Sequence, residues 1–320
     1  MRLGEANCLR GLGHIDMSRG NLIEARTKYT DAGQLFRSAG DRLGEGHVLA
    51  GLGGLEIIFG NYAAAKRNYG DAYKLFEAEQ SKVSMAVLSR RMGDLECELA
   101  HFKEARRLYD LVAKDFSPAE VSSDTASLAL SLGRLEFITG KAAEAACHFR
   151  IAHDFFKKES YDNGEADALR GLADVALDSA QTDLAREQYE PALALFQKLG
   201  DRLSEHELMA KLAELEFSLK NWQLVESYLA KALQVFMDVG YRAAQAQVYR
   251  QQAELAAAKG NKDFAKDLFK QARQIYQALG LPLELARVDL SEGSLHDSQC
   301  ATFLKGAQES FQKLGLASWA

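Results

Sequence analysis

Proline is nearly absent from the sequence, at 3 of 320 residues or about 1%, where ~5% is usual. Because proline interrupts helices, its scarcity favours long helices over a loop-rich or all-β chain. The 4 cysteines include no Cys-x-x-Cys pair, which excludes a zinc knuckle and a dithiol redox motif. We expect them to be reduced, mostly buried thiols of an intracellular protein.

Long apolar runs and signals for export are also missing. No stretch reaches roughly 18 uncharged apolar residues, and the N-terminus is polar, so neither a membrane span nor a signal peptide is predicted. A net charge of −6 is a poor match for nucleic acid. We therefore expect a cytoplasmic protein that does not bind nucleic acid or insert into a membrane.

Catalytic signatures are absent as well. The sequence contains no phosphate-binding loop, no serine-hydrolase elbow and no His-Glu-x-x-His motif. Its 7 histidines are better explained as surface or packing residues than as metal ligands. The sequence thus predicts a protein that is not an enzyme and that needs no metal or cofactor.

What the sequence does contain is a repeat of forty residues, and 320 is eight times forty. A small residue recurs in each unit, and an aliphatic residue follows it two positions later. The small residues are Gly13, Gly53, Gly93, Gly133, Ala173, Ala213, Ala253 and Gly293. Later in the unit come alanine, aromatic, alanine and aromatic at spacings of four, three and four, as in Ala25, Tyr29, Ala32 and Phe36.

Each unit predicts two helices. The first covers roughly residues 4–19 of the unit, and a break such as Gly20-Asn21 follows, where glycine suits the left-handed end of a helix. The second helix carries the alanine and aromatic series on one face. One helix pair cannot bury its apolar face alone, so neighbouring units must stack into an all-α solenoid.

The pattern of small and aromatic residues resembles the tetratricopeptide repeat (TPR) family over nearly the whole chain. The forty-residue period and the connectors at 40–46 and 200–206 resemble its long-helix branch, which includes LGN/Pins-type scaffolds and MalT-type sensor repeats. The resemblance implies a right-handed α-solenoid of about eight repeats, forming a single domain over residues 1–320. The predicted repeats are about 1–40, 41–80, 81–120, 121–160, 161–200, 201–240, 241–280 and a shortened 281–315.

The two ends of the chain also repeat internal sequence. Residues 1–5 match the connector at 41–45, so the chain begins inside a connector, and we expect it to be part of a longer protein. The final unit is about five residues short and lacks the aromatic register, as is common for a terminal capping repeat.

The resemblance implies that partners bind the concave face, which the first helices line. Ten residues into alternate units the sequence has an arginine, and four residues later it has a histidine or an acid. These residues are Arg10, Arg90, Arg170 and Arg250, then His14, Asp94, Asp174 and Glu254. They are either intrahelical pairs or a row of arginines that binds carboxylates or phosphates of a ligand.

Two further features of the predicted face have more than one interpretation. A stripe that contains Phe137, Leu177 and Phe217 either packs between repeats or anchors a peptide. Units five and six are acidic on the same face, which is either a solvated surface or a groove for a basic or amphipathic segment. The acids are Asp167, Asp174, Asp178, Glu207 and Glu214.

The carboxylate clamp of chaperone-binding TPR proteins is only partly present. Arg10 and Arg91 fit its basic positions, but His14 and Gly51 stand where the clamp has asparagines, and Val87 stands where it has a lysine. The sequence therefore does not predict binding to a chaperone C-terminus.

Together these observations predict a non-catalytic scaffold that binds a peptide or protein segment in the concave groove. The alternative is a ligand-sensing repeat domain of a larger signalling ATPase or transcription regulator, in which a small molecule shifts an equilibrium between states. The candidate partner-binding residues are Arg10, His14, Arg90, Arg91, Asp94, Arg134, Phe137, Asp167, Arg170, Asp174, Asp178, Glu207, Glu214, Phe217, Arg250 and Glu254.

Overall fold

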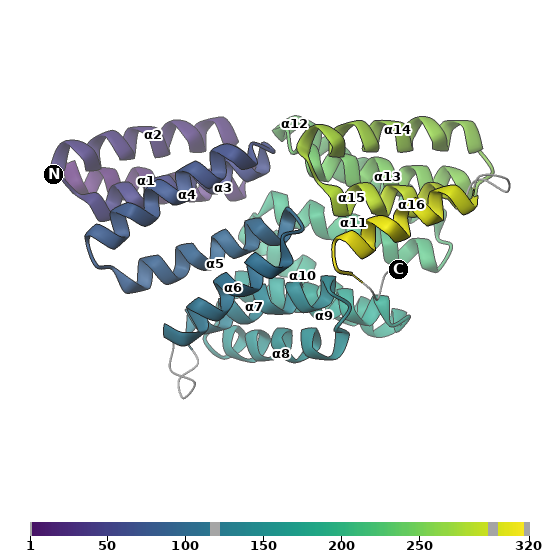
Figure 1. Cartoon of the computed structure of the whole chain (residues 1–320), viewed down its shortest axis with the longest axis horizontal. Coiled ribbons are helices and arrows are strands. Elements are labelled where there is room, and N and C mark those ends of the chain that lie inside the picture. The colour runs from purple at the N-terminus through teal and green to yellow at the C-terminus, as the bar shows by residue number, and fades with distance from the viewer. Residues whose placement is uncertain (1, 116–121, 294–299, 317–320) are drawn as a thin grey trace.

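The computed structural model describes residues 2–115, 122–293 and 300–316, and all regular structure in these ranges is α-helical (Figure 1). The helices are α1 Arg2–Ser18, α2 Leu22–Ala39, α3 Arg42–Ile58, α4 Tyr62–Ala78, α5 Lys82–Glu98, α6 Phe102–Asp115, α7 Ser123–Ile138, α8 Ala142–Lys158, α9 Asp162–Asp178, α10 Thr182–Leu199, α11 Arg202–Ser218, α12 Trp222–Val239, α13 Arg242–Ala258, α14 Lys262–Leu279, α15 Pro282–Gly293 and α16 Cys300–Lys313. Consecutive helices pack as tandem pairs, which confirms the predicted all-α solenoid. We keep the word repeat for the predicted forty-residue units.

The breaks between helices depend on the left-handed backbone region. Gly20 and Gly60 have φ of +81° and +76°, where a glycine carries no steric penalty. Ala100, in the equivalent place of the third repeat, takes φ +62° despite its side chain. At the start of α3 the Asp41 carboxylate accepts the Gly44 N–H at 2.8 Å, which satisfies a free helix donor. Turn chemistry thus recurs about every twenty residues, as the sequence predicts.

The small and aromatic residues of the repeat form the core. Ala25, Tyr29, Ala32 and Phe36 of α2 are fully buried. A Cβ atom on Gly53 would lie 2.3 Å from the Cε1 atom of Tyr69, closer than any side chain tolerates. The glycine of the first helix is therefore needed because the aromatic ring of the second helix lies directly on its backbone.

A second set of contacts joins repeats that are far apart in the sequence. A Cβ atom on Gly20 would lie 3.0 Å from Cγ1 of Val239, and one on Gly60 would lie 2.4 Å from Cδ2 of Leu279. Both pairs are separated by 219 residues, so the contact recurs one repeat further along the chain. We call this contact between successive turns the seam.

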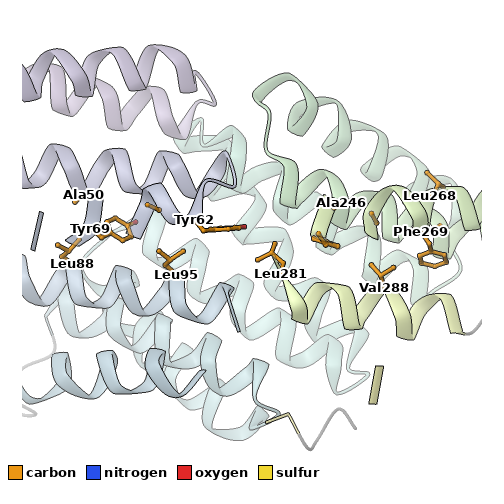
Figure 2. Packing of buried hydrophobic residues seen from close by; sticks show 14 of the residues in the cluster. Ala50, Tyr62, Tyr69, Leu88, Leu95, Ala246, Leu268, Phe269, Leu281 and Val288 are labelled. Carbon is orange, nitrogen blue, oxygen red and sulfur yellow. The ribbon is translucent and has the colours of Figure 1, made fainter. Parts of the chain in front are cut away.

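The seam has a continuous hydrophobic core. One buried cluster joins α3, α4 and α5 to α13, α14 and α15, and Figure 2 shows Tyr62 and Leu281 facing each other within it. Other clusters join α1–α3 to α11 and α12, and α5–α7 to α15 and α16. The sequence predicts only contacts between neighbouring repeats, whereas the folded chain curls far enough for repeats one to three to contact repeats six to eight.

Two smaller points complete the fold. None of the described helices is long and apolar enough to cross a membrane. Cys97 is buried as predicted, but Cys8 and Cys147 are exposed free thiols, because both lie on faces that no neighbouring helix covers. The side chain of Cys300 lies outside the described residues.

Candidate functional site: the inner face of the first helices

The first helices of successive repeats contact one another directly, from α1 and α3 through to α13 and α15. Their polar side chains therefore form one surface, which we call the inner face. In Figure 1 the second helices α2, α8 and α14 lie at the outer edge of the molecule, while α7, α11 and α13 lie nearer its middle. All of the predicted partner-binding residues lie on first helices, but they fall into groups with different partners.

In repeat five the arginine is neutralised by acids from two helices. The Arg170 guanidinium donates to Asp167 at 2.6 Å and to Glu207 of α11 at 3.0 Å. Asp167 also accepts from Arg134 of α7 at 3.3 Å. Burial disfavours the Arg170 charge, but Asp167, Glu207 and Asp174 outweigh it, so the pKa of Arg170 lies above its usual value.

A similar network spans repeats six and seven. Glu214 accepts from Lys211 at 3.0 Å and from Gln251 at 2.8 Å, and Arg250 lies 3.7 Å away. Arg250 also donates to Glu254 at 2.5 Å. Burial raises the pKa of Glu214, but the charges of Lys211 and Arg250 outweigh it and hold that pKa below its usual value.

The residue four positions after each arginine has a partner that spacing on one helix does not predict. Asp94 and Asp174 accept the hydroxyl hydrogens of tyrosines in their second helices, at 2.8 Å from Tyr109 and 2.6 Å from Tyr189. Asp94 still pairs with Arg90 at 2.9 Å. Arg170 instead pairs with Asp167 and with Glu207 of α11, and no pair between Arg170 and Asp174 forms.

Two arginines in repeats one and three, Arg10 and Arg91, lack such partners. Arg10 donates only to the Asn7 side chain, at 3.2 Å, and its Nε atom is buried without a hydrogen bond. Arg91 forms no ion pair with any residue that the structure describes. His14 bonds the Tyr29 hydroxyl through Nδ1 at 2.8 Å. Burial, helped by the charges of Arg91 and Arg10, lowers the pKa of His14 to about 4.

The predicted aromatic residues are partly packed. Phe137 is half-buried against the core of α7 and α8, and Phe217 is half-buried with its ring 5.3 Å from that of Trp222. Phe217 also lines a small cavity of about 160 Å³ beside Glu214 and Glu254. Asp178 is exposed at the C-terminal end of α9.

A cavity on the inner face lies where α5, α7 and α9 meet. Its volume is about 520 Å³, and its lining includes Arg90, Ser127, Ser131, Arg134 and Asp167. Three of these residues were predicted from the sequence. The serines were missed, because serine at these places breaks no pattern and carries no charge.

Sequence reasoning also missed residues that the fold brings together. Burial lowers the pKa of His47 below its usual value, and the charges of Arg10 and Arg91 lower it further. At the seam, Glu98 accepts the Tyr62 hydroxyl hydrogen at 2.7 Å. Burial raises the pKa of Glu98 to about 7, with Glu207 of α11 adding to the effect. Among the residues that the structure describes, no cluster of His, Cys, Asp and Glu could hold a metal ion.

Comparison with known proteins agrees with this architecture. Residues 204–278 match the tetratricopeptide repeat family. The helix pairs in this range, α11–α12 and α13–α14, match tetratricopeptide repeats. The long-helix branch of the family stays a prediction, and no curated protein matches the sequence.

Solved structures with the same arrangement cover almost the whole chain at low sequence identity. The Rap conjugation gene regulator of plasmid pLS20, in complex with its Phr peptide, is 13% identical with a TM-score of 0.70, and the match covers 98% of this chain and 96% of that one. A Rap protein complexed with Competence and Sporulation Factor is 13% identical with a TM-score of 0.65, covering 99% and 95%. A signal-transduction ATPase with a TPR sensor from Pyrococcus horikoshii is 16% identical with a TM-score of 0.54, covering 98% of this chain and 47% of that one.

Proposed function

We propose that this TPR chain is a non-catalytic scaffold that binds a peptide or an extended protein segment along its inner face. The observation that carries the proposal is the cavity of about 520 Å³ where three first helices meet, with charged and hydroxyl side chains in its lining. A concave site with a few converging polar groups is the usual form of a ligand site. The two Rap structures that share this fold were solved with a peptide or signalling factor bound.

The chemistry of the cavity suits a peptide backbone. Ser127, Arg90 and Arg134 supply hydrogen-bond donors, and Asp167 and the serine hydroxyls supply acceptors. A peptide offers both N–H and C=O groups, which these side chains can bind without any need for a deep apolar pocket. Affinity then comes from many shallow contacts along successive repeats.

The charge of the inner face differs between repeats five and six and repeats one to three. In repeats five and six, the first helices α9 and α11 carry nine acids and only three lysines and arginines, and Asp178 is exposed. In repeats one to three, the first helices α1, α3 and α5 carry seven acids and eight lysines, arginines and histidines, so this region is less acidic. This gradient favours a basic or amphipathic segment at repeats five and six, with electrostatic attraction guiding its approach.

The test begins with selection of binders from a displayed library of random peptides on the immobilised chain. Ser127→Phe fills the cavity from one of its walls, and Ala143→Phe, on the exposed side of α8, is the matched control. We expect Ser127→Phe to weaken the selected peptides at least tenfold and Ala143→Phe to leave them unchanged. Equal binding by both variants would exclude this cavity as the peptide site.

A regulatory sensor domain is the second candidate function, and the ATPase that carries a TPR sensor is the observation that favours it. In that case a small ligand would stabilise one state of the superhelix. A thermal-shift screen of sugars, nucleotides and peptides would reveal the ligand as a rise in melting temperature. A rise with a sugar or nucleotide but with no peptide would favour the sensor over the scaffold.

A further inference from the structure

One side of α1 exposes residues whose equivalents in α3 are buried. Ile15 is 47% exposed, whereas Leu55, forty residues later, is fully buried. Cys8 is exposed, whereas Val48 is buried. The difference arises because α2 packs on this side of α3, while no second helix among the described residues packs on the same side of α1. The end face, as we call this side of α1, consists of Gly4, Cys8, Gly11 and Ile15.

Two glycines at the equivalent places of α3 receive aromatic rings from the helix before it. A Cβ atom at Gly44 would overlap the ring of Phe36, and one at Gly51 would lie 2.8 Å from Cε1 of Tyr29. Helices approach this closely only where one of them has a small residue at the contact. The two rings come from one helix and are seven residues apart in its sequence.

The same arrangement recurs between α8 and α9. A Cβ atom at Gly164 would lie 2.5 Å from Cγ of Phe156, and one at Gly171 would lie 2.5 Å from Cε1 of Phe149. The two aromatic residues are again seven apart on one helix. In both cases this pair of glycines accompanies a helix that places two aromatic rings on it.

The end face has the same pair of glycines, Gly4 and Gly11, at the same places in its repeat. A Cβ atom built on either of them meets no other atom within 4 Å. Glycine lowers the stability of a helix relative to alanine, and no contact among the described residues requires it at these two places. Packing of a further helix on α1 explains both glycines.

A charged residue beside the glycine pair defines the occupant further. Glu45 of α3 pairs at 2.6 Å with Arg37, the residue directly after the second ring of α2. Glu205 of α11 accepts from Gln197, at the same place of α10, at 3.0 Å. The equivalent Glu5 of α1 is exposed and forms no ion pair with any residue that the structure describes. A basic residue directly after the second aromatic residue of the occupant would pair with it.

The seam provides an independent contact for the same occupant. Its successive contacts join Gly20 to Val239 and Gly60 to Leu279. One repeat earlier the same register reaches Leu199 at the end of α10, which is 43% exposed, whereas Val239 is 9% exposed. A helix that packs on the end face as α2 packs on α3 therefore brings the turn before it to Leu199.

We propose that the end face docks an amphipathic helix of a partner protein, with two aromatic residues seven apart and a basic residue directly after the second. Gly11 receives the first ring, Gly4 receives the second, and Glu5 pairs with the basic residue. The partner thus continues the stack of helix pairs beyond α1. Apart from Leu199, these contacts share no residue with the lining of the inner-face cavity.

The test uses α2 as the probe, because its Tyr29, Phe36 and Arg37 have the required spacing. A synthetic peptide of residues 19–41 carries a lactam bridge between positions 27 and 31, which are exposed in α2, so that it stays helical. Fluorescence anisotropy measures its binding to the intact chain. We expect saturable binding that falls at least tenfold when the probe carries Tyr29→Ala and Phe36→Ala.

A double variant of the chain, Gly4→Ala and Gly11→Ala, removes the space for both rings. Its new Cβ atoms meet nothing in the free chain and alanine favours the helix, so the melting temperature should stay the same or rise. Probe binding should nevertheless fall at least tenfold. Gly70→Ala on α4, where a Cβ atom also meets nothing within 4 Å, is the matched control and should change binding less than twofold.

Two further variants test the charge and the seam. Glu5→Arg should weaken the probe about threefold, as for loss of an exposed ion pair, and a probe with Arg37→Glu should bind this variant more tightly than it binds the wild type. Leu199→Asp should weaken the probe by at least a similar factor, because Gly20 of the probe lies opposite Leu199 in the proposed arrangement.

Any of four results would overturn the proposal. The first is the absence of saturable binding, and the second is binding that the double glycine variant reduces no more than Gly70→Ala does. The third is binding that Ser127→Phe removes, which would place the probe in the inner-face cavity. The fourth is self-association of the chain that the double glycine variant abolishes, which would make a second copy the occupant instead of a partner protein.

Discussion

Repeats one to three and repeats five to seven share the same helix pair, yet two arginines of the first region, Arg10 and Arg91, differ in their partners from Arg170 and Arg250 of the second. Arg170 and Arg250 each lie within ion-pair distance of two carboxylates, one of them from a neighbouring first helix. Arg10 and Arg91 pair with none of the described acids. The difference shows that the repeat fixes where an arginine lies, while acids on its own helix and on the neighbouring first helix decide whether its charge is paired.

The largest expected effect comes from removing an arginine that pairs with two carboxylates in repeats five to seven. Arg170→Ala leaves Asp167 and Glu207 without their shared cation in a surface where Arg170 itself is only 16% exposed. We expect a loss of about 2–3 kcal/mol in the free energy of unfolding, because the carboxylates stay largely desolvated. Chemical denaturation measures it, and a loss under about 0.5 kcal/mol would mean that the network is solvated and does not stabilise the fold.

The next effect concerns the seam that brings the two halves together. The pKa of Glu98 is about 7 in the folded chain and has its ordinary value of 4.5 in the unfolded chain. Between these two pH values the folded carboxyl group keeps its proton, whereas the unfolded one has lost it. Stability should therefore fall as the pH rises from about 4.5 to 7. Glu98→Gln, which can still accept from Tyr62, should remove this dependence and raise stability above pH 7 by about 1–2 kcal/mol.

A control for the seam keeps the charge and removes the hydrogen bond. Tyr62→Phe should leave the direction of the pH dependence unchanged while lowering stability by about 1 kcal/mol. Identical pH profiles for the wild type and Glu98→Gln would contradict the assignment of Glu98 as the titrating group.

A single substitution can give repeat one the pattern of repeat three, in which the arginine has an acidic partner. His14→Asp gives repeat one the residue that Asp94 supplies to both Arg90 and Tyr109. The new carboxylate should pair with Arg10 and add about 0.3–0.5 kcal/mol of stability, as for an i,i+4 ion pair. Chemical denaturation measures the change, and an unchanged or lower free energy of unfolding would contradict the expected pair.

The smallest effect on stability is expected from removing Arg91, which pairs with none of the described acids. Arg91→Ala should change the free energy of unfolding by less than about 0.5 kcal/mol, in contrast to Arg170→Ala. Because Arg91 is the largest charge effect on His14, its loss should raise the pKa of His14, which NMR can follow. A large destabilisation would mean that Arg91 has a structural partner in solution.

Much of this architecture could be predicted because it depends on local spacing. The Ala25, Tyr29, Ala32 and Phe36 series predicts a buried helix face, and the series is buried. The glycine in the first helix predicts a close approach of the second, and the Tyr69 ring lies against Gly53. Such features need only the helical period and one neighbouring helix.

The candidate site was only partly predictable, because its contacts come from different repeats. Spacing on one helix suggests that Arg170 pairs with Asp174, but Tyr189 and Glu207 from neighbouring helices change that partnership. His47 comes near Arg10 and Arg91 only because α3 stacks between α1 and α5. The seam between Gly60 and Leu279 depends on the curvature summed over five repeats, which no single repeat encodes.

The pKa of His14 tests the contrast between the two halves most directly. An NMR titration of the His14 imidazole in the intact chain should give a pKa of about 4, and a double variant with Arg10→Ala and Arg91→Ala should give a higher one. A wild-type value at or above 6.5, unchanged in the double variant, would contradict the account, because it would mean that the arginine charges near His14 are already neutralised.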